Sequence, residues 1–125
     1  IEPNVKEGEG GLRDIHYALW IAQAKFKVKT FDELLPKGIL LEKELRTFEK
    51  GLNFLLLIRS ELHYLAERRE DRLGFEFQEK IAKFLGFKDA ELPGVERFMR
   101  IYYLRANDTR EQSNRLIEKC VTVPR

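Results

Sequence analysis

The sequence contains little of what disulfide frameworks, metal centres and membrane spans require. Cys120 is the only cysteine among 125 residues, so no internal disulfide can form. The two histidines, His16 and His63, show no ligand spacing with Cys120, which argues against a structural zinc site. No apolar run approaches the length of a membrane span, and we expect neither a transmembrane helix nor a signal peptide. These features favour a protein of the reducing cytoplasm.

The charge balance gives no reason to expect a nucleic acid or an anionic membrane as partner. The chain has 23 basic and 21 acidic residues and a formal charge of +2. Charged residues make up 35% and hydrophobic residues 43%, the profile of a soluble globular domain. The chain opens on Ile1 and not on methionine. We therefore expect residues 1–125 to form a single domain cut from a longer protein.

Apolar residues recur at intervals of three and four along most of the chain, the period of an amphipathic helix. No segment has the alternation of a strand, so the sequence predicts an all-α fold. The expected architecture is a single bundle of about five helices with a glycine-rich N-terminal loop. The expected helices cover about Leu12–Phe26, Phe31–Leu35, Leu41–Arg69, Phe75–Leu85 and Gly94–Cys120. Gly51, inside the longest of them, predicts a close helix crossing.

A glycine-rich loop stands directly before the first expected helix. Gly10 and Gly11 would leave backbone N–H groups free at the positive end of the helix dipole, with Lys6 and Arg13 beside them. This arrangement favours an anion, although the loop matches neither a P-loop nor a dinucleotide fingerprint. The alternative is a plain turn closed by Asp14, whose carboxylate would accept the N–H group of Gly11.

Arg59 interrupts the apolar seam of the longest expected helix, and His63 follows it by one turn. A buried guanidinium without a partner costs several kcal/mol, so an anion must face it. An internal ion pair with Asp14, Glu2 or Asp71 is one interpretation, and a nucleotide phosphate is the other. For His63 alone, the favoured interpretation is a hydrogen-bonded structural histidine, because a lone histidine more often has that role than a ligand-binding one.

The stretch EPNVKEGEGGLRDI at residues 2–15 resembles the signature of the bifunctional uridylyltransferase/uridylyl-removing enzymes that modify the nitrogen-regulatory PII protein. Glu9 departs from the proline that this family carries there. The resemblance continues over essentially the whole chain, at Asp71-Arg72-Leu73, at Gln78 and along Val95–Tyr103. It implies an ion-pair network at Asp71 and Arg72 that fixes a turn, and a Gln78 side chain that satisfies backbone groups in the core.

In this family the corresponding helical region follows a nucleotidyltransferase domain and precedes a uridylyl-removing domain and two ACT domains. The resemblance therefore implies a domain that packs on the transferase domain, helps to form the UTP/PII site and serves the regulation of nitrogen metabolism. We expect Mg²⁺ and UTP in the parent enzyme and no cofactor or metal in this fragment. The residues expected to approach the nucleotide are Lys6, Gly10, Gly11, Arg13 and Asp14, with Asp14 orienting Arg13 or Arg59. The expected supporting polar network comprises Arg59, His63, Asp71, Arg72 and Gln78.

Two alternatives remain beside this interpretation. The adenylyltransferase of glutamine synthetase has a related Gly-Gly-Leu/Ile-Arg-Asp-Ile element but continues with Glu-Phe, where this chain has His16-Tyr17. A second alternative is a structural scaffold between domains, without a site. The sequence shows no Gly-Ser loop with paired carboxylates and no His-Asp doublet. We therefore assign no catalytic residue and expect the isolated chain to be inactive.

Overall fold

The computed structural model describes residues 2–122 and builds them from helices. The all-α prediction is confirmed, because the described residues contain no strand and only one isolated bridge, between Asn4 and Arg72. A short 3₁₀ turn, Phe31–Leu34, joins the first two α-helices. The four α-helices are α1 (Leu12–Phe26), α2 (Glu42–Ala66), α3 (Phe75–Phe84) and α4 (Gly94–Thr122).

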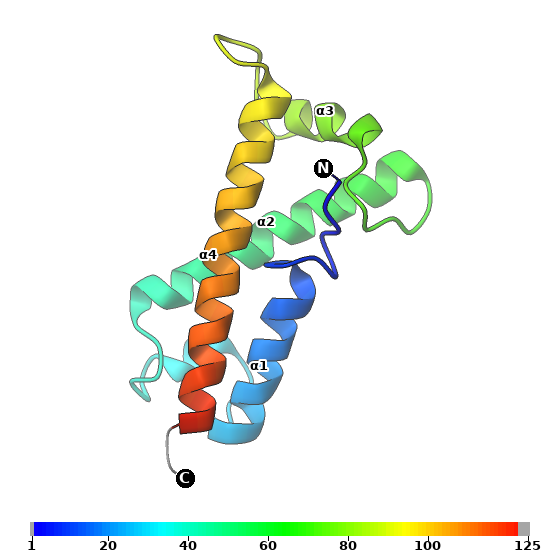
Figure 1. The fold of residues 1–125 in the computed structure, drawn as a ribbon. Helices are drawn as coiled ribbons and strands as arrows, with labels where there is room; N and C mark the ends of the chain where they lie inside the picture. Colours follow the sequence, from blue (N-terminus) through cyan, green and yellow to red (C-terminus); the bar gives the residue numbers. More distant parts are fainter. Residues whose placement is uncertain (1, 123–125) are drawn as a thin grey trace.

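The longest helix, α4, is the element on which the others pack. Figure 1 shows α1 lying beside its C-terminal half, α3 near its N-terminal end and α2 crossing it between them. The segment before α1 runs close to α2 and to the chain that enters α3. The N-terminal loop therefore sits where three helices approach one another.

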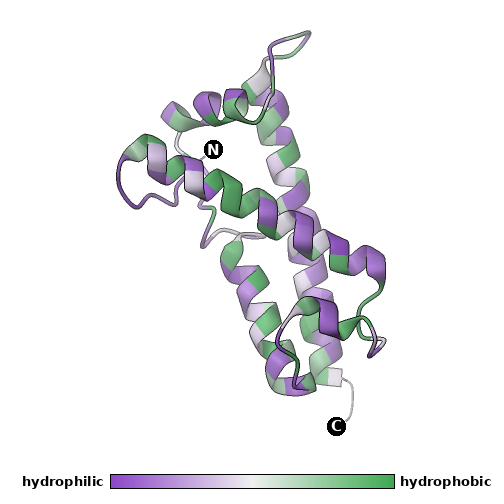
Figure 2. Ribbon diagram, turned by 180° about the vertical axis from the view of Figure 1, so that it is seen from behind, coloured by the Kyte–Doolittle hydropathy of each residue, from purple (hydrophilic) through white to green (hydrophobic). Residues whose placement is uncertain are grey.

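The core follows from the amphipathic character of each helix. Figure 2 shows hydrophobic and hydrophilic residues interleaved along the helices, as expected where each helix buries one face. Phe31 stacks on Phe48 with ring centroids 4.3 Å apart, which fastens the 3₁₀ turn to α2. The largest fully buried side chains include Phe48, Phe98, Leu12, Ile15, Ile58, Leu62, Ile81 and Leu116. Among the described helices, none combines the length and apolar character that a membrane crossing needs.

Several element boundaries differ from the sequence-based expectation, including shifts of one residue at the start of α2 (Glu42) and at the end of α3 (Phe84). The expected helix at 31–35 is a 3₁₀ turn of four residues, so the count is four α-helices and one turn in the described residues. The long helix ends at Ala66 and not at Arg69, because Glu67 adopts a left-handed conformation with φ 56°. The last helix continues to Thr122, two residues beyond the expected end.

Candidate functional site

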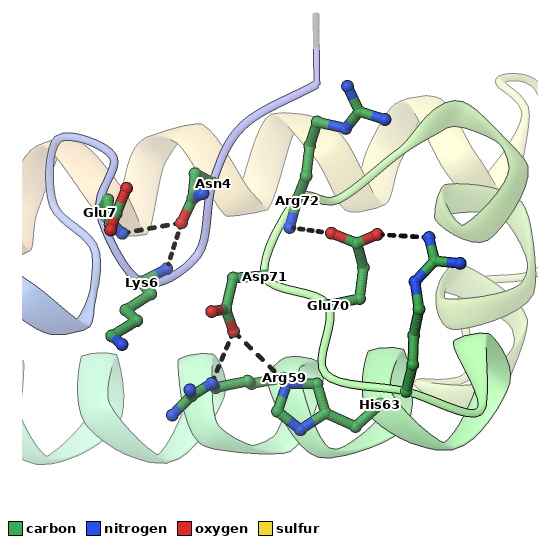
Figure 3. Close-up of polar contacts among 9 residues, drawn as sticks. Asn4, Lys6, Glu7, Arg59, His63, Glu70, Asp71 and Arg72 are labelled. Atoms are coloured by element: carbon green, nitrogen blue, oxygen red, sulfur yellow. Dashed lines mark hydrogen bonds and ion pairs between the residues drawn. The ribbon is translucent and has the colours of Figure 1, made fainter.

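The N-terminal loop is shaped by the side chain of Asn4. Its Oδ1 accepts the N–H groups of Lys6 at 3.0 Å and Glu7 at 2.8 Å (Figure 3). The carbonyl oxygen of Asn4 accepts the N–H group of Gly8 at 2.9 Å. An asparagine side chain that bonds to the backbone just ahead is a common way to close a tight turn. The turn reverses the chain, so Lys6 lies beside the start of α1.

The backbone N–H groups of Gly10 to Arg13, at the start of α1, have acceptors within the chain, so the prediction that Gly10 and Gly11 leave N–H groups free is wrong for these residues. Gly10 donates to Asp14 Oδ2 at 2.6 Å and Gly11 donates to the carbonyl of Gly8 at 2.9 Å. The next two N–H groups, of Leu12 and Arg13, donate to the carbonyls of Val5 at 3.0 Å and Lys6 at 2.8 Å. The loop therefore caps its own helix, and Gly10 and Gly11 offer no open amides to an anion.

Gly10 has a packing role in this arrangement. Its φ of 71° lies in the left-handed region, and a Cβ atom there would collide with the backbone carbonyl of Ala106 in α4.

Asp14 accepts the N–H group of Gly10 and not that of Gly11, one residue earlier than predicted. Arg13 bonds to Glu7 and Arg59 bonds to Asp71, so the expectation that Asp14 orients one of them is also wrong for the described residues.

The side chains that could bind an anion gather on the outer side of the loop. Lys6, Arg13 and Arg59 line one hollow of about 320 Å³, which we call the cationic hollow. Its remaining lining is Leu12, His16 and Tyr17. The hollow thus combines three positively charged side chains with the apolar side chain of Leu12 and the phenol ring of Tyr17.

The three cations of the cationic hollow differ in how they are neutralised. Arg13 Nη2 lies 2.9 Å from Glu7 Oε1, and both side chains are more than half exposed. Arg59 Nε lies 2.7 Å from Asp71 Oδ1 in a more buried pair. Within residues 2–122 the ammonium group of Lys6 forms no ion pair. The hollow therefore keeps one unpaired cation and one loosely paired cation available to a ligand.

Asp71 fixes the position of Arg59. Its carboxylate oxygen also lies 3.4 Å from His63 Nε2, and Figure 3 shows Lys6 and the Arg59 guanidinium extending to the same side of it. Burial alone would raise the pKa of Asp71, but the hydrogen bonds from Arg59 and His63 and their charges outweigh it and lower the pKa. Of the three carboxylates predicted for Arg59, the structure therefore selects Asp71.

The backbone around Asp71 holds the N-terminal segment in place as well. The carbonyl oxygen of Asp71 accepts the N–H group of Val5 at 2.7 Å, and Leu73 donates its N–H group to the carbonyl of Pro3 at 2.7 Å. Asp71 thereby connects α2, through Arg59, with the loop that carries Lys6. A displacement of Asp71 would move both cations.

The other predicted polar residues lie away from the cationic hollow. Arg72 is exposed, and its guanidinium lies 3.9 Å from Glu2. The carboxylate of Glu2 also accepts the N–H group of Phe75 at 2.8 Å, at the start of α3. Gln78 is buried and donates its side-chain N–H to the carbonyl of Leu73 at 3.0 Å. These contacts hold the turn before α3 and do not reach the hollow.

Sequence reasoning missed three residues of this site. Glu7 pairs with Arg13, and His16 and Tyr17 line the hollow. A signal for Tyr17 was present, because a residue four positions after Arg13 lies on the same helical face. In residues 2–122 no three His, Cys, Asp or Glu side chains gather closely enough to hold a metal ion. The side chains of the hollow are of the type that binds and positions an anion.

The sequence of this chain matches the model of one protein family and is similar to individual members of that family. The family model described as GlnD PII-uridylyltransferase matches residues 1–117. A bifunctional uridylyltransferase/uridylyl-removing enzyme of Azospirillum brasilense is 46% identical over 109 residues. The enzyme of the same name in Phenylobacterium zucineum is 44% identical over 109 residues. Each match covers 86% of this chain but only 12% of the relative's length. No solved structure matches the chain.

Proposed function

Since the chain belongs to the GlnD PII-uridylyltransferase family, we propose that it serves as the helical domain beside the nucleotidyltransferase centre of such an enzyme. In this role it packs on the transferase domain of the same polypeptide and helps to form the site where UTP meets the PII protein. It contributes to nitrogen regulation in the cytoplasm and has no catalytic activity alone. The uridylyl-removing domain is its second neighbour in the polypeptide.

The observation that carries this proposal is the convergence of Lys6, Arg13 and Arg59 on one hollow. A hydrogen bond between charged partners contributes about 1.5–3 kcal/mol, roughly twice a neutral one. The triphosphate of UTP carries several negative charges over a length that two or three such side chains can follow. Lys6 is unpaired in the described residues and Arg13 is only weakly held by an exposed carboxylate, so both can turn to a phosphate at little cost.

The phosphate contacts in this proposal come from side chains and not from the Gly10–Gly11 backbone. The N–H groups of that backbone already have acceptors, so the glycines shape the loop that presents Lys6. Asp71 holds Arg59 at the inner edge of the hollow. Tyr17 offers a flat surface beside the cations, on which a base can stack.

Nucleotidyl transfer depends mainly on positioning and on neutralising the charge of the phosphoryl group. In this scheme Lys6 and Arg13 bind and orient the triphosphate, and the acidic residues that hold Mg²⁺ belong to the transferase domain. The Mg²⁺ ions supply charge neutralisation at the reacting phosphate. The side chains of this domain complete the electrostatic environment from the other side.

The test is alanine substitution at Arg13 and at Lys6 in a full-length enzyme that contains this domain. Arg13→Ala should raise the KM for UTP or lower kcat by about tenfold or more, as expected for one lost charge-assisted contact of about 1.5–3 kcal/mol. The melting temperature should stay unchanged, because the lost Arg13–Glu7 pair is exposed.

Arg46→Ala is the matched control for this experiment. Arg46 forms an equally exposed pair with Glu42 at 2.7 Å, remote from the cationic hollow. Unchanged uridylylation in Arg13→Ala and Lys6→Ala, or an equal loss in Arg46→Ala, would contradict a nucleotide-binding role. The domain would then be a structural connection between its neighbours.

A further inference from the structure

A stripe of exposed side chains begins at the cationic hollow and continues along one face of α1. It comprises Arg13, Tyr17, Trp20 and Ala24, which follow one another at intervals of four, three and four and share one face of the helix. Tyr17 is 52% and Trp20 is 65% exposed. We call this surface the α1 stripe. Tyrosine, tryptophan and arginine are the residues most enriched at protein interfaces.

The α1 stripe joins two hollows on the surface. Tyr17 lines the cationic hollow at one end, and its ring centroid lies 6.1 Å from that of Trp20. Trp20 lines a second hollow of about 210 Å³ at the other end, and the rest of its lining is Ile21, Ala24, Lys25, Cys120 and Val121. Val121 is itself 77% exposed. The second hollow is largely apolar and thus suits a protruding apolar side chain of a protein partner.

We propose that the transferase domain of the same polypeptide covers the α1 stripe and inserts an apolar side chain into the hollow beside Trp20. This inference rests on the proposed function, which requires the transferase centre to reach Lys6 and Arg13. Those two residues line the same hollow as Tyr17, and Trp20 adjoins Tyr17, so a domain seated on Lys6 and Arg13 has the stripe directly beside it. The relatives supply ample chain for such a neighbour, because this chain spans 12% of their length.

Another exposed aromatic side chain provides the comparison. Tyr64 on α2 is 76% exposed, more than Trp20, but it lines none of the hollows beside α1. If exposure alone marked an interface, Tyr64 would be covered as readily as Trp20. The inference predicts that Trp20 is covered and Tyr64 is not.

The test places the photo-crosslinking residue p-benzoylphenylalanine at position 20 of the full-length enzyme, with position 64 as the control. Illumination should join position 20 to a peptide of the transferase domain within the same polypeptide, identified by mass spectrometry. Position 64 should give no such product. Because Trp20 is mostly exposed, the replacement should leave the domain folded. A separate variant with p-benzoylphenylalanine at position 17 tests the same contact from the neighbouring position.

Each other outcome overturns the proposal. A crosslinked dimer would identify a second copy as the occupant, a product formed only when PII is added would identify PII, and a product with the uridylyl-removing domain would identify that neighbour. Absence of any product at positions 17 and 20 would show an open surface. Trp20→Glu should also reduce uridylylation by about thirtyfold or more, the loss expected for an interface hot spot, whereas Tyr64→Glu should not.

The outcome is separable from that of the nucleotide proposal. A crosslink to the transferase domain together with normal activity of Arg13→Ala would support the docking surface and contradict the phosphate contacts. Lost activity of Arg13→Ala without any crosslink at position 20 would support the phosphate contacts and contradict the docking surface.

Discussion

Thr109 of α4 occupies the space that a side chain at Gly51 of α2 would need. A Cβ atom built on Gly51 would lie 2.5 Å from Thr109 Oγ1, and both residues are buried. The close helix crossing predicted from Gly51 is therefore confirmed, and its partner is now known. The crossing fixes α2 against α4, and α2 carries Arg59 to the cationic hollow.

Gly51→Ala should destabilise the 125-residue chain by about 1–2 kcal/mol. Overpacking costs about 1–3 kcal/mol, and the better helix propensity of alanine returns up to about 1 kcal/mol. Thr109 cannot easily turn away, because it is β-branched and buried. Urea unfolding measures the change in free energy. In a Thr109→Ala background the same substitution should be neutral or stabilising, and an equal loss in both backgrounds would contradict this contact as its cause.

Gly10→Ala should cost substantially more than Gly38→Ala. Both glycines have a left-handed φ, 71° and 74°, so both substitutions carry a conformational cost of about 1–2 kcal/mol. A Cβ atom at Gly38 meets nothing within 4 Å, whereas one at Gly10 meets the backbone of Ala106. The difference between the two unfolding free energies therefore reports the packing of the N-terminal loop on α4. Equal losses would show that the loop moves aside without cost.

The helices were predictable from the sequence because each one repeats its apolar residues along many turns. The occupied N–H groups at the start of α1 were not predictable. Their acceptors, the carbonyls of Val5 and Lys6, are backbone atoms that reach the helix only because Asn4 turns the chain. The spacing of residues in a sequence does not indicate such backbone contacts. It therefore placed Lys6 and Arg13 correctly beside the start of the helix, but wrongly predicted free N–H groups at Gly10 and Gly11.

Arg59 shows a similar limit. Its position in an apolar seam was enough to predict a facing anion, since an unpaired buried charge is too costly. Choosing among Asp14, Glu2 and Asp71 required the path of the chain after α2, which depends on the left-handed Glu67. Glutamate has no strong preference for that conformation, so the helix was expected to run on to Arg69. The turn brings Asp71 back to within 2.7 Å of Arg59.

Asp71→Asn should destabilise the chain by about 1–3 kcal/mol at neutral pH, since it removes the charge from a partly buried, hydrogen-bonded pair. Folding lowers the pKa of Asp71. Its stabilising effect is therefore fully present above the ordinary carboxyl pKa of about 4 and is lost as the pH falls through the lowered value.

Urea unfolding of the wild-type chain and the Asp71→Asn variant from pH 7 down to pH 3 measures this effect. The two free energies of unfolding should converge at the acidic end. Asp108→Asn removes an exposed carboxylate that has no ion pair in the described residues, and it controls for the change in net charge. A constant difference across the range would contradict an ionic role of Asp71.

Glu7 should compete with the nucleotide for Arg13. The Arg13–Glu7 pair is exposed, so Glu7→Gln should leave the stability of the domain within about 0.5 kcal/mol. Once released, Arg13 no longer has to leave a carboxylate before it meets a phosphate. The KM for UTP of the full-length enzyme should therefore fall by up to about fivefold, the equivalent of an exposed pair worth up to about 1 kcal/mol.

Glu42→Gln is the matched control for Glu7→Gln, since Glu42 forms a similar exposed pair with Arg46. Steady-state uridylylation kinetics should show no change in that variant. In an Arg13→Ala background the effect of Glu7→Gln should disappear, because the arginine through which it acts is missing. A fall in KM that persists there would mean that Glu7 repels the nucleotide directly. A rise in KM would mean that Glu7 is needed to aim Arg13 into the hollow, and competition would be the wrong description of this pair.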